Sequence, residues 1–206
     1  MRNNNLNNLL DANILNVSID EVRLKVLNAI KTLCYEKKEF TLVSGRKSDF
    51  YIDLRRISFD GDYLYYIGRI FYEELKVFKS KLAFDVIAGV PVGGIPLISS
   101  ILTNSFLDGN PLKSVVIRKE KKGYGKENMI EPMQFLHKDA KIMIVEDVVT
   151  TGGSILKAVE NARNEGYIVK NAICIVDREE GGKENLKEKG IELISLFIKA
   201  DIINNN

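Results

Sequence analysis

The stretch IVEDVVTTGGSIL, residues 144–156, decides how the rest of the chain is interpreted. It begins as an apolar run typical of a buried strand and then places two carboxylates, Glu146 and Asp147, side by side. Two threonines, two glycines and a serine follow, and a helical pattern starts directly after them. The order of apolar strand, polar loop and helix predicts a strand-to-helix turn that faces a ligand.

The polar loop, Thr150 to Ser154, has the composition of a phosphate-binding turn. Gly152 and Gly153 allow backbone N–H groups to approach a ligand closely, and the three hydroxyls add donors. The start of a helix supplies oriented N–H groups and partial positive charge. The loop has neither the lysine of a Walker-type loop nor the glycine spacing of the dinucleotide fingerprint. It therefore predicts a site for a phosphate monoester.

The two acids before the loop restrict the ligand further. Carboxylates repel a phosphate unless the ligand also carries hydroxyls or a developing positive charge, and a ribose 5-phosphate offers both. A solvated strand end before an ordinary helix cap would explain Glu146 and Asp147 alone, but not the whole stretch. The predicted ligand segment is Glu146, Asp147, Val148, Val149, Thr150, Thr151, Gly152, Gly153 and Ser154.

The rest of the chain alternates predicted strands with predicted helices. A helix is expected from Asp20 with Ser18 or Asp20 as its cap, then a strand, a turn at Ser44-Gly45 and a strand within 39–57, and then a helix over about 62–77. Apolar strands follow at 84–90, 114–118, 141–148, 171–176 and 191–198, and further helices begin at Pro96 and Ser154. This alternation predicts an α/β fold with a mostly parallel central sheet flanked by helices.

Ligands of such sheets bind beyond the carboxyl ends of the strands, which share one edge. Four predicted strands end there in polar or glycine-rich sequence. These ends are the turn at 91–94, Arg118 with Lys119, Glu146 with Asp147, and Asp177 with Arg178. We expect all four to meet around one ligand.

Composition narrows the class of protein. The chain has 206 residues, 45% hydrophobic and 28% charged, with a formal net charge of +2. These values predict a single globular domain over 1–206, with an asparagine-rich start loosely ordered over 1–18. They argue against a nucleic-acid or membrane-surface partner. The uncharged run 86–102 contains two prolines and several glycines, which predicts a buried strand, turn and helix rather than a membrane span.

Cysteine usage indicates the compartment. Cys34 and Cys174 fall within apolar patterns, so we expect both to be buried and unpaired. No Cys/His spacing predicts zinc, and His137 is the only histidine. A reducing cytoplasm fits a chain without a disulfide framework.

The segment IMIVEDVVTTGGSI, 142–155, resembles the signature of the type I phosphoribosyltransferases. Four more segments resemble the orotate-using members of that family, in the family's order along the chain. They are FTLVSGRKSDFYID (40–53), GVPVGGIP (89–96), IRKEKKGYG (117–125) and DREEGG (177–182). The resemblance covers the chain from about 40 to 182 and implies orotate phosphoribosyltransferase activity, with a small hood built from N-terminal and C-terminal segments.

The resemblance implies ligands, partners and roles. Ribose 5-phosphate would pass from phosphoribosyl pyrophosphate to orotate, giving orotidine 5'-phosphate in pyrimidine biosynthesis, with Mg²⁺ bound mainly through substrate rather than protein. A homodimer with shared active sites and a mobile catalytic loop at 119–131 is implied. Phosphoribosyl pyrophosphate would bind the ligand segment plus Arg118, Lys119, Lys122 and Tyr124, and these four with Asp147 would be catalytic. Orotate would bind Thr150, Arg178, Tyr51 and Ile52, and Phe50, Tyr51 and Ile52 would cover its planar ring.

Three positions depart from the family's pattern. Some members carry lysines where this chain has Val43 and Gly93, and many carry a histidine at Tyr124. The anion clamp then falls to Arg118, Lys119 and Lys122. Two other readings stay open: a phosphoribosyltransferase for another base, such as a purine, and a non-catalytic sensor of phosphoribosyl pyrophosphate.

Overall fold

The computed structural model describes residues 17–37, 40–41, 47–48, 50–82, 84–118, 120 and 129–203. Its centre is a sheet of six strands in the order β10-β9-β8-β5-β6-β7. The strands are β5 (Val86–Gly89), β6 (Ser114–Ile117), β7 (Ile130–Glu131), β8 (Lys141–Val149), β9 (Ile168–Asp177) and β10 (Glu192–Ile198). All neighbours pair in parallel except β6 and β7, which confirms the predicted mostly parallel sheet.

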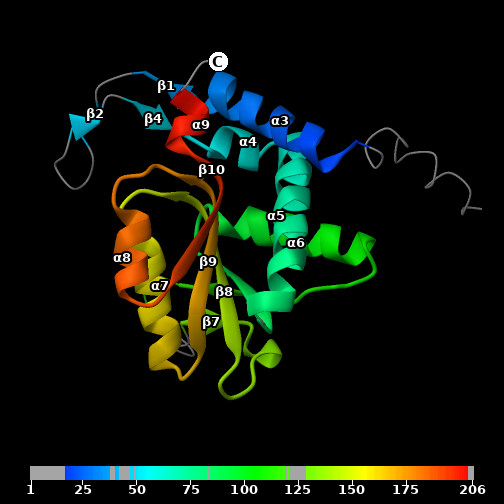
Figure 1. Cartoon of the computed structure of the whole chain (residues 1–206). Helices are drawn as coiled ribbons and strands as arrows, with labels where there is room; N and C mark the ends of the chain where they lie inside the picture. The colour runs from blue at the N-terminus through cyan, green and yellow to red at the C-terminus, as the bar shows by residue number, and fades with distance from the viewer. Residues whose placement is uncertain are drawn as a thin grey trace, which may run out of the picture.

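Helices cover both faces of this sheet (Figure 1). On one face α3 (Ile19–Ala29), α5 (Gly61–Leu82) and α6 (Gly94–Leu107) build a core with Ile87, Met143 and Ile173. On the other face α7 (Gly153–Asn164) and α8 (Gly182–Glu188) pack on Ile144 and Ala172. Successive strand residues point to opposite faces, so a strand covered on both faces must be apolar throughout. This explains why the sequence of β8 up to residue 145 contains no polar alternation.

A smaller layer lies over the end of the sheet where β10 stops. The chain turns from α3 through a π-helical segment, η1 (Ile30–Cys34), into β1 (Tyr35–Glu36), which pairs antiparallel with β4 (Tyr51–Ile52). The helices α4 (Arg55–Ser58) and α9 (Lys199–Ile203) join them, and α9 packs against η1 (Figure 1). We call this layer the hood. The N-terminal and C-terminal segments expected to build a hood therefore do so.

The hairpin predicted over 39–57 is partly confirmed. Two short strands, β2 (Phe40–Thr41) and β3 (Lys47–Ser48), pair antiparallel on either side of the expected turn. The second predicted strand is divided, because β4 pairs with β1 and not with β2. The turn at Ser44-Gly45 lies outside the described residues.

Several boundaries differ from the predicted ones. The first helix begins after Ser18, which forms a capping box with Glu21, as one of the two expected caps. The helix expected to start at Pro96 begins at Gly94, and β8 continues through Glu146 and Asp147 to Val149. The short elements β1, β7, α4, α8, α9 and the 3-10 turn η2 (Met133–Phe135) were not predicted, because two to seven residues carry too little periodicity.

Both cysteines are buried and free, as predicted. Burial raises the pKa of the Cys34 thiol to about 12, with smaller effects from Asp53 and Arg56. Burial also raises the pKa of Cys174, and the nearby carboxylates of Asp177, Glu146 and Asp147 act in the same direction. Among the described residues, no helix is both long and apolar enough to cross a membrane.

The contact between α5 and α6 depends on Gly68. A Cβ atom there would lie 2.6 Å from Ser100 Cβ and 2.8 Å from the Ser100 carbonyl carbon, and the Ser100 hydroxyl donates to the Leu64 carbonyl oxygen at 2.7 Å. We expect Gly68→Ala to lower the free energy of unfolding by about 1–3 kcal/mol, because overpacking outweighs alanine's better helix propensity.

Urea unfolding followed by circular dichroism would measure this effect. Gly61→Ala is the matched control, since a Cβ at Gly61 has no atom within 4 Å and should cost nothing. A Gly68→Ala protein as stable as the wild type would contradict the close packing of α5 on α6.

Candidate active site

The candidate site lies at the edge where the parallel strands β5, β6, β8 and β9 end, which we call the rim. The hood covers this edge, since α9 begins directly after β10 and β10 runs parallel to its neighbours (Figure 1). Three of the four predicted strand ends contribute charged side chains, from β6, β8 and β9: Arg118, Glu146 with Asp147, and Asp177 with Arg178. The fourth, the turn at 91–94, contains a cis peptide between Pro91 and Val92.

Glu146 and Asp147 are fixed by their own strand. Glu146 is buried at 6% exposure, and one of its carboxylate oxygens accepts from the Asp147 N–H at 3.1 Å. Asp147 is half-buried and accepts from the Val148 N–H at 2.7 Å. The acids are neighbours in a strand, so their side chains leave opposite faces. Their carboxylates therefore lie on different sides of the strand and could contact two different parts of a ligand.

The backbone of Gly93 lies directly against the side chain of Asp147. A Cβ atom at position 93 would overlap the Asp147 carboxylate, so the turn after β5 lies directly against this acid. A side chain at position 93 would require the carboxylate to move. Gly93 and Asp147 thus form one wall of the site, and the structure accounts for a glycine here where the family pattern allows lysine.

The predicted phosphate loop, residues 150–154, is backed by α8. Gly152 is the N-cap of α7 with a left-handed φ of 80°, a conformation that favours glycine. A Cβ at Gly182 would lie 2.6 Å from the Thr150 carbonyl oxygen, and Asn185 Nδ2 donates to the Thr151 carbonyl oxygen at 3.0 Å. Two carbonyl groups of the loop therefore face α8. The first N–H groups of a helix have no partner within the helix, and they remain available to an anion.

Arg178 is held deep in the rim. Its backbone N–H donates to the Val149 carbonyl oxygen at 2.9 Å, which ties it to the strand before the phosphate loop. The side chain is 5% exposed, and Nη2 lies 2.7 Å from a Glu180 carboxylate oxygen. The guanidinium carbon is 4.5 Å from the centre of the Phe50 ring. A buried arginine at this place can receive a planar anion bidentately.

Asp177, next to Arg178, is an acid that the sequence had placed at the rim without a role. It is 3% exposed and accepts from the Glu179 N–H at 2.9 Å. Burial raises the pKa of its carboxyl group, and that hydrogen bond opposes the rise. This pattern is typical of a carboxylate that shapes the loop after β9.

The predicted base-binding side chains lie in or next to β4 of the hood. Ile52 is 6% exposed and Tyr51 is half-buried. Phe50 is 2% exposed, and its ring stacks on Tyr35 with centroids 6.0 Å apart. The structure thus brings Phe50 of the hood within 4.5 Å of the Arg178 guanidinium carbon, and base binding by Tyr51 and Ile52 stays a prediction.

Arg118 connects the two ends of the loop that follows β6. Its Nη2 and Nε lie 2.9 Å and 3.3 Å from a Glu131 carboxylate oxygen, and its N–H donates to the Met129 carbonyl oxygen at 2.8 Å. Asn161 Nδ2 donates to the Arg118 carbonyl oxygen at 2.9 Å. Both ends of the predicted catalytic loop are therefore anchored on the sheet and on α7. Lys119, Lys122, Tyr124 and Val43 lie outside the described residues.

Arg55 is a rim cation that sequence reasoning missed. Its Nε and Nη2 donate to Asp53 at 2.7 Å and 3.0 Å, and this bond lowers the pKa of Asp53. Asp53 also contributes most to raising the pKa of Arg55, with lesser contributions from Tyr51 and Asp147. Arg56 instead binds Glu36 and the Leu33 carbonyl oxygen within the hood. Sequence alone could not tell which of the two arginines lies near the acids of β8.

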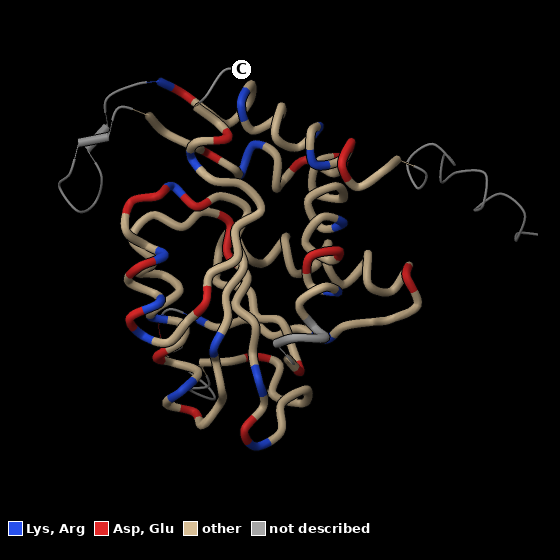
Figure 2. The backbone as a smooth tube through the Cα atoms, in the orientation of Figure 1, with Lys and Arg blue, Asp and Glu red and all other residues tan. Residues whose placement is uncertain are grey.

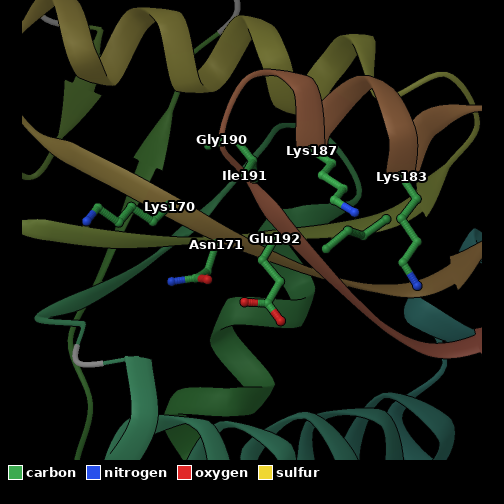
Figure 3. Close-up of a pocket in the computed structure, with 8 residues that line it drawn as sticks. Lys170, Asn171, Lys183, Lys187, Gly190, Ile191 and Glu192 are labelled. Carbon is green, nitrogen blue, oxygen red and sulfur yellow. The ribbon is translucent and has the colours of Figure 1, made fainter.

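A separate surface pocket of about 750 Å³ lies at the opposite, amino-terminal end of β9 and β10. Figure 3 shows Lys183 and Lys187 extending from α8 alongside Glu192 and Asn171. Charged side chains of this kind protect an exposed edge strand from pairing with another chain. In the view of Figure 2, acidic and basic residues are interspersed along the described part of the chain.

Comparison with known proteins agrees with this geometry. Residues 67–200 match the family model described as phosphoribosyl transferase domain. The chain is 43% identical over 166 residues to the orotate phosphoribosyltransferase of Aquifex aeolicus, covering 80% of this chain and 86% of that protein.

Solved structures give the same picture. One crystal structure of orotate phosphoribosyltransferase from Mycobacterium tuberculosis H37Rv superposes with a TM-score of 0.73 at 28% identity, covering 89% of this chain and 99% of that one. Its complex with 5-phospho-alpha-D-ribosyl 1-diphosphate gives 0.69 at 27% identity, covering 88% and 98%.

Proposed function

The chain belongs to the phosphoribosyltransferase family, among whose members it is similar to orotate phosphoribosyltransferases, and we propose that it transfers ribose 5-phosphate from phosphoribosyl pyrophosphate to orotate. The products are orotidine 5'-phosphate and pyrophosphate, which places the reaction in pyrimidine biosynthesis. One observation carries the proposal. The acids Glu146 and Asp147 lie directly before a helix-start phosphate loop, and a buried arginine, Arg178, ends the adjacent strand.

The ribose phosphate is assigned to β8 and the loop after it. N–H groups and hydroxyls of residues 150–154 bind the 5-phosphate at the start of α7. Glu146 and Asp147 accept hydrogen bonds from the ribose hydroxyls and stabilise positive charge that develops at C1. Val148 and Val149 hold these groups in register through the strand. Gly93 keeps the turn after β5 close to Asp147, so the reacting carbon is enclosed by both segments.

Orotate is assigned to the space between the rim and the hood. Arg178 receives its carboxylate, Thr150 orients the ring, and Tyr51 and Ile52 supply the wall from β4. The electron-rich ring nitrogen is the nucleophile, so little acid–base chemistry is required of the protein. Catalysis comes from positioning the two substrates and from stabilising the leaving pyrophosphate.

Pyrophosphate is assigned to the catalytic loop. Arg118, Lys119, Lys122 and Tyr124 surround the leaving group, and Arg55 adds a cation from the hood side. Arg118 anchors the start of the loop through Glu131. The proposed role of the loop is to close over the leaving pyrophosphate and to reopen after the reaction. The loop is proposed to act in the site of a second subunit, in a homodimer. Both free thiols are buried, which suits a reducing cytoplasm.

Mg²⁺ fits the oxygen donors of this rim. Among the described residues no group of three or more His, Cys, Asp or Glu side chains forms a metal cage. We propose that the ion is bound mainly by substrate oxygens and water, as Mg²⁺ prefers with phosphates. When bound, it neutralises the charge on pyrophosphate. The two acids of the ligand segment, Glu146 and Asp147, would contact such an ion through its bound waters.

The fall in orotate absorbance on adding phosphoribosyl pyrophosphate and Mg²⁺ tests the proposal. We expect a magnesium-dependent fall matched by pyrophosphate release. No fall with orotate, together with turnover of hypoxanthine, would assign the site to a purine base instead. Tight binding of phosphoribosyl pyrophosphate without turnover of any base would indicate a sensor.

A further inference from the structure

Phe50 joins three segments that are far apart in the chain. Its ring lies 4.5 Å from the Arg178 guanidinium carbon at the end of β9 and 4.9 Å from Lys199 Nζ at the start of α9. The ring itself precedes β4, in the hood. Tyr35 of β1 stacks on it with an interplanar angle of 27°. Arg178 and Lys199 therefore both contact the same aromatic ring.

The surroundings of the Phe50 ring leave little of it for a ligand. The residue is 2% exposed, and two cations and an aromatic ring contact it. A planar base needs an accessible ring face to stack on. The structure therefore points to a different task for Phe50 from the neighbouring wall residue Tyr51, which is half-buried.

The orientation of Arg178 depends on its contacts beyond the backbone. Glu180 binds the Nη2 edge of the guanidinium, and the Phe50 ring lies against the group within cation–π range. A bidentate bond to a carboxylate requires a defined guanidinium plane. Removing the ring would free the plane while leaving the charge in place.

We propose that Phe50 is a positioning residue for Arg178, and that Lys199, on the same ring, makes α9 part of the base site. The ring sets the guanidinium plane for a carboxylate-bearing base, and the two cations favour that negative charge over a neutral base. This inference rests on the proposed function, because it assigns affinity for the base to a contact between the hood and the rim.

Steady-state kinetics on the full-length protein test the role in base binding. Phe50→Leu is expected to raise KM for orotate by about tenfold, in the range of a lost cation–π contact, with KM for phosphoribosyl pyrophosphate unchanged. Phe50→Tyr should restore the wild-type value, and Lys199→Met should raise KM for orotate by a smaller factor. Phe59→Leu is the matched control, since Phe59 lies in the same layer but is 62% exposed. An unchanged KM for orotate, or equal rises for both substrates, would overturn the inference.

A second measurement needs no substrate. It tests the contact between Phe50 and Arg178 separately from the proposed activity with orotate. The side-chain Nε–H signal of Arg178, identified by its loss in Arg178→Lys, should be shifted upfield by the ring in the wild type. It should return toward the usual arginine position in Phe50→Leu or, if that protein does not fold, in Phe50→Met. A wild-type signal at the usual position would overturn the contact itself. A shifted signal in a protein that does not use orotate would instead remove the proposed function, and the role in base binding with it.

Discussion

Replacing Arg178 by alanine is expected to lower kcat/KM for orotate by about 10²- to 10³-fold, the range for deleting one partner of a buried charged pair. The guanidinium carbon lies 4.5 Å from the centre of the Phe50 ring in the hood, and only 5% of the side chain is exposed. Its removal also leaves the Glu180 carboxylate without its partner at 2.7 Å. That charge would then repel the carboxylate of orotate, which adds to the loss.

Steady-state kinetics with each substrate varied in turn would measure the effect. KM for phosphoribosyl pyrophosphate should stay near the wild-type value, because the phosphate loop is supported by α8 and not by the arginine side chain. Glu180→Gln is the control: it keeps Arg178 and removes a competing anion, so KM for orotate should not rise. Equal losses for both substrates in the Arg178→Ala protein would show that Arg178 is structural.

The core of the fold was predictable because its signals are local. Five predicted apolar strands, two of them followed by a polar or glycine-rich turn and a helix, favour a covered, mostly parallel sheet. The placement of Glu146 beside the phosphate loop follows from residues 144–156 alone. The hood was less predictable, because β1 and β4 are two residues each and are defined by pairing across the fourteen residues between them.

The difference between local sequence signals and tertiary packing also explains which site residues were predicted and which were missed. Glu146 and Arg178 follow from the rule that parallel strands end at one edge. Arg55 and Lys199 do not, since each reaches the rim from a short hood helix whose position depends on tertiary packing. The burial of Phe50 could not be predicted from the sequence either. An aromatic residue in a strand-like segment gives the same sequence pattern whether its ring faces a ligand or two cations.

Replacing Lys122 by alanine is expected to lower kcat by about 10² or more, the loss typical of a missing transition-state donor. Leaving pyrophosphate carries several negative charges, and the described rim contributes mainly cations that are already paired, Arg55 with Asp53 and Arg118 with Glu131. Lys122 lies outside the described residues, so this prediction rests on its place in the sequence. Lys170→Ala, an exposed lysine at the other end of the sheet, is the control and should keep full turnover. Unchanged turnover in Lys122→Ala would refute the anion clamp.

Mixing the Lys122→Ala and Arg178→Ala proteins would then decide whether sites are shared. Each variant alone has two damaged sites in a dimer. If the loop acts in the partner's site, every mixed dimer contains one site with both residues intact and one with neither. Random reassortment of a twofold dimer should therefore restore about a quarter of the wild-type activity. If Lys122 acts within its own subunit, each mixed dimer has one defect in each site and no activity returns. The recovery thus tests the dimer and the two residue assignments together, since it requires Lys122 and Arg178 to serve one active site from different chains.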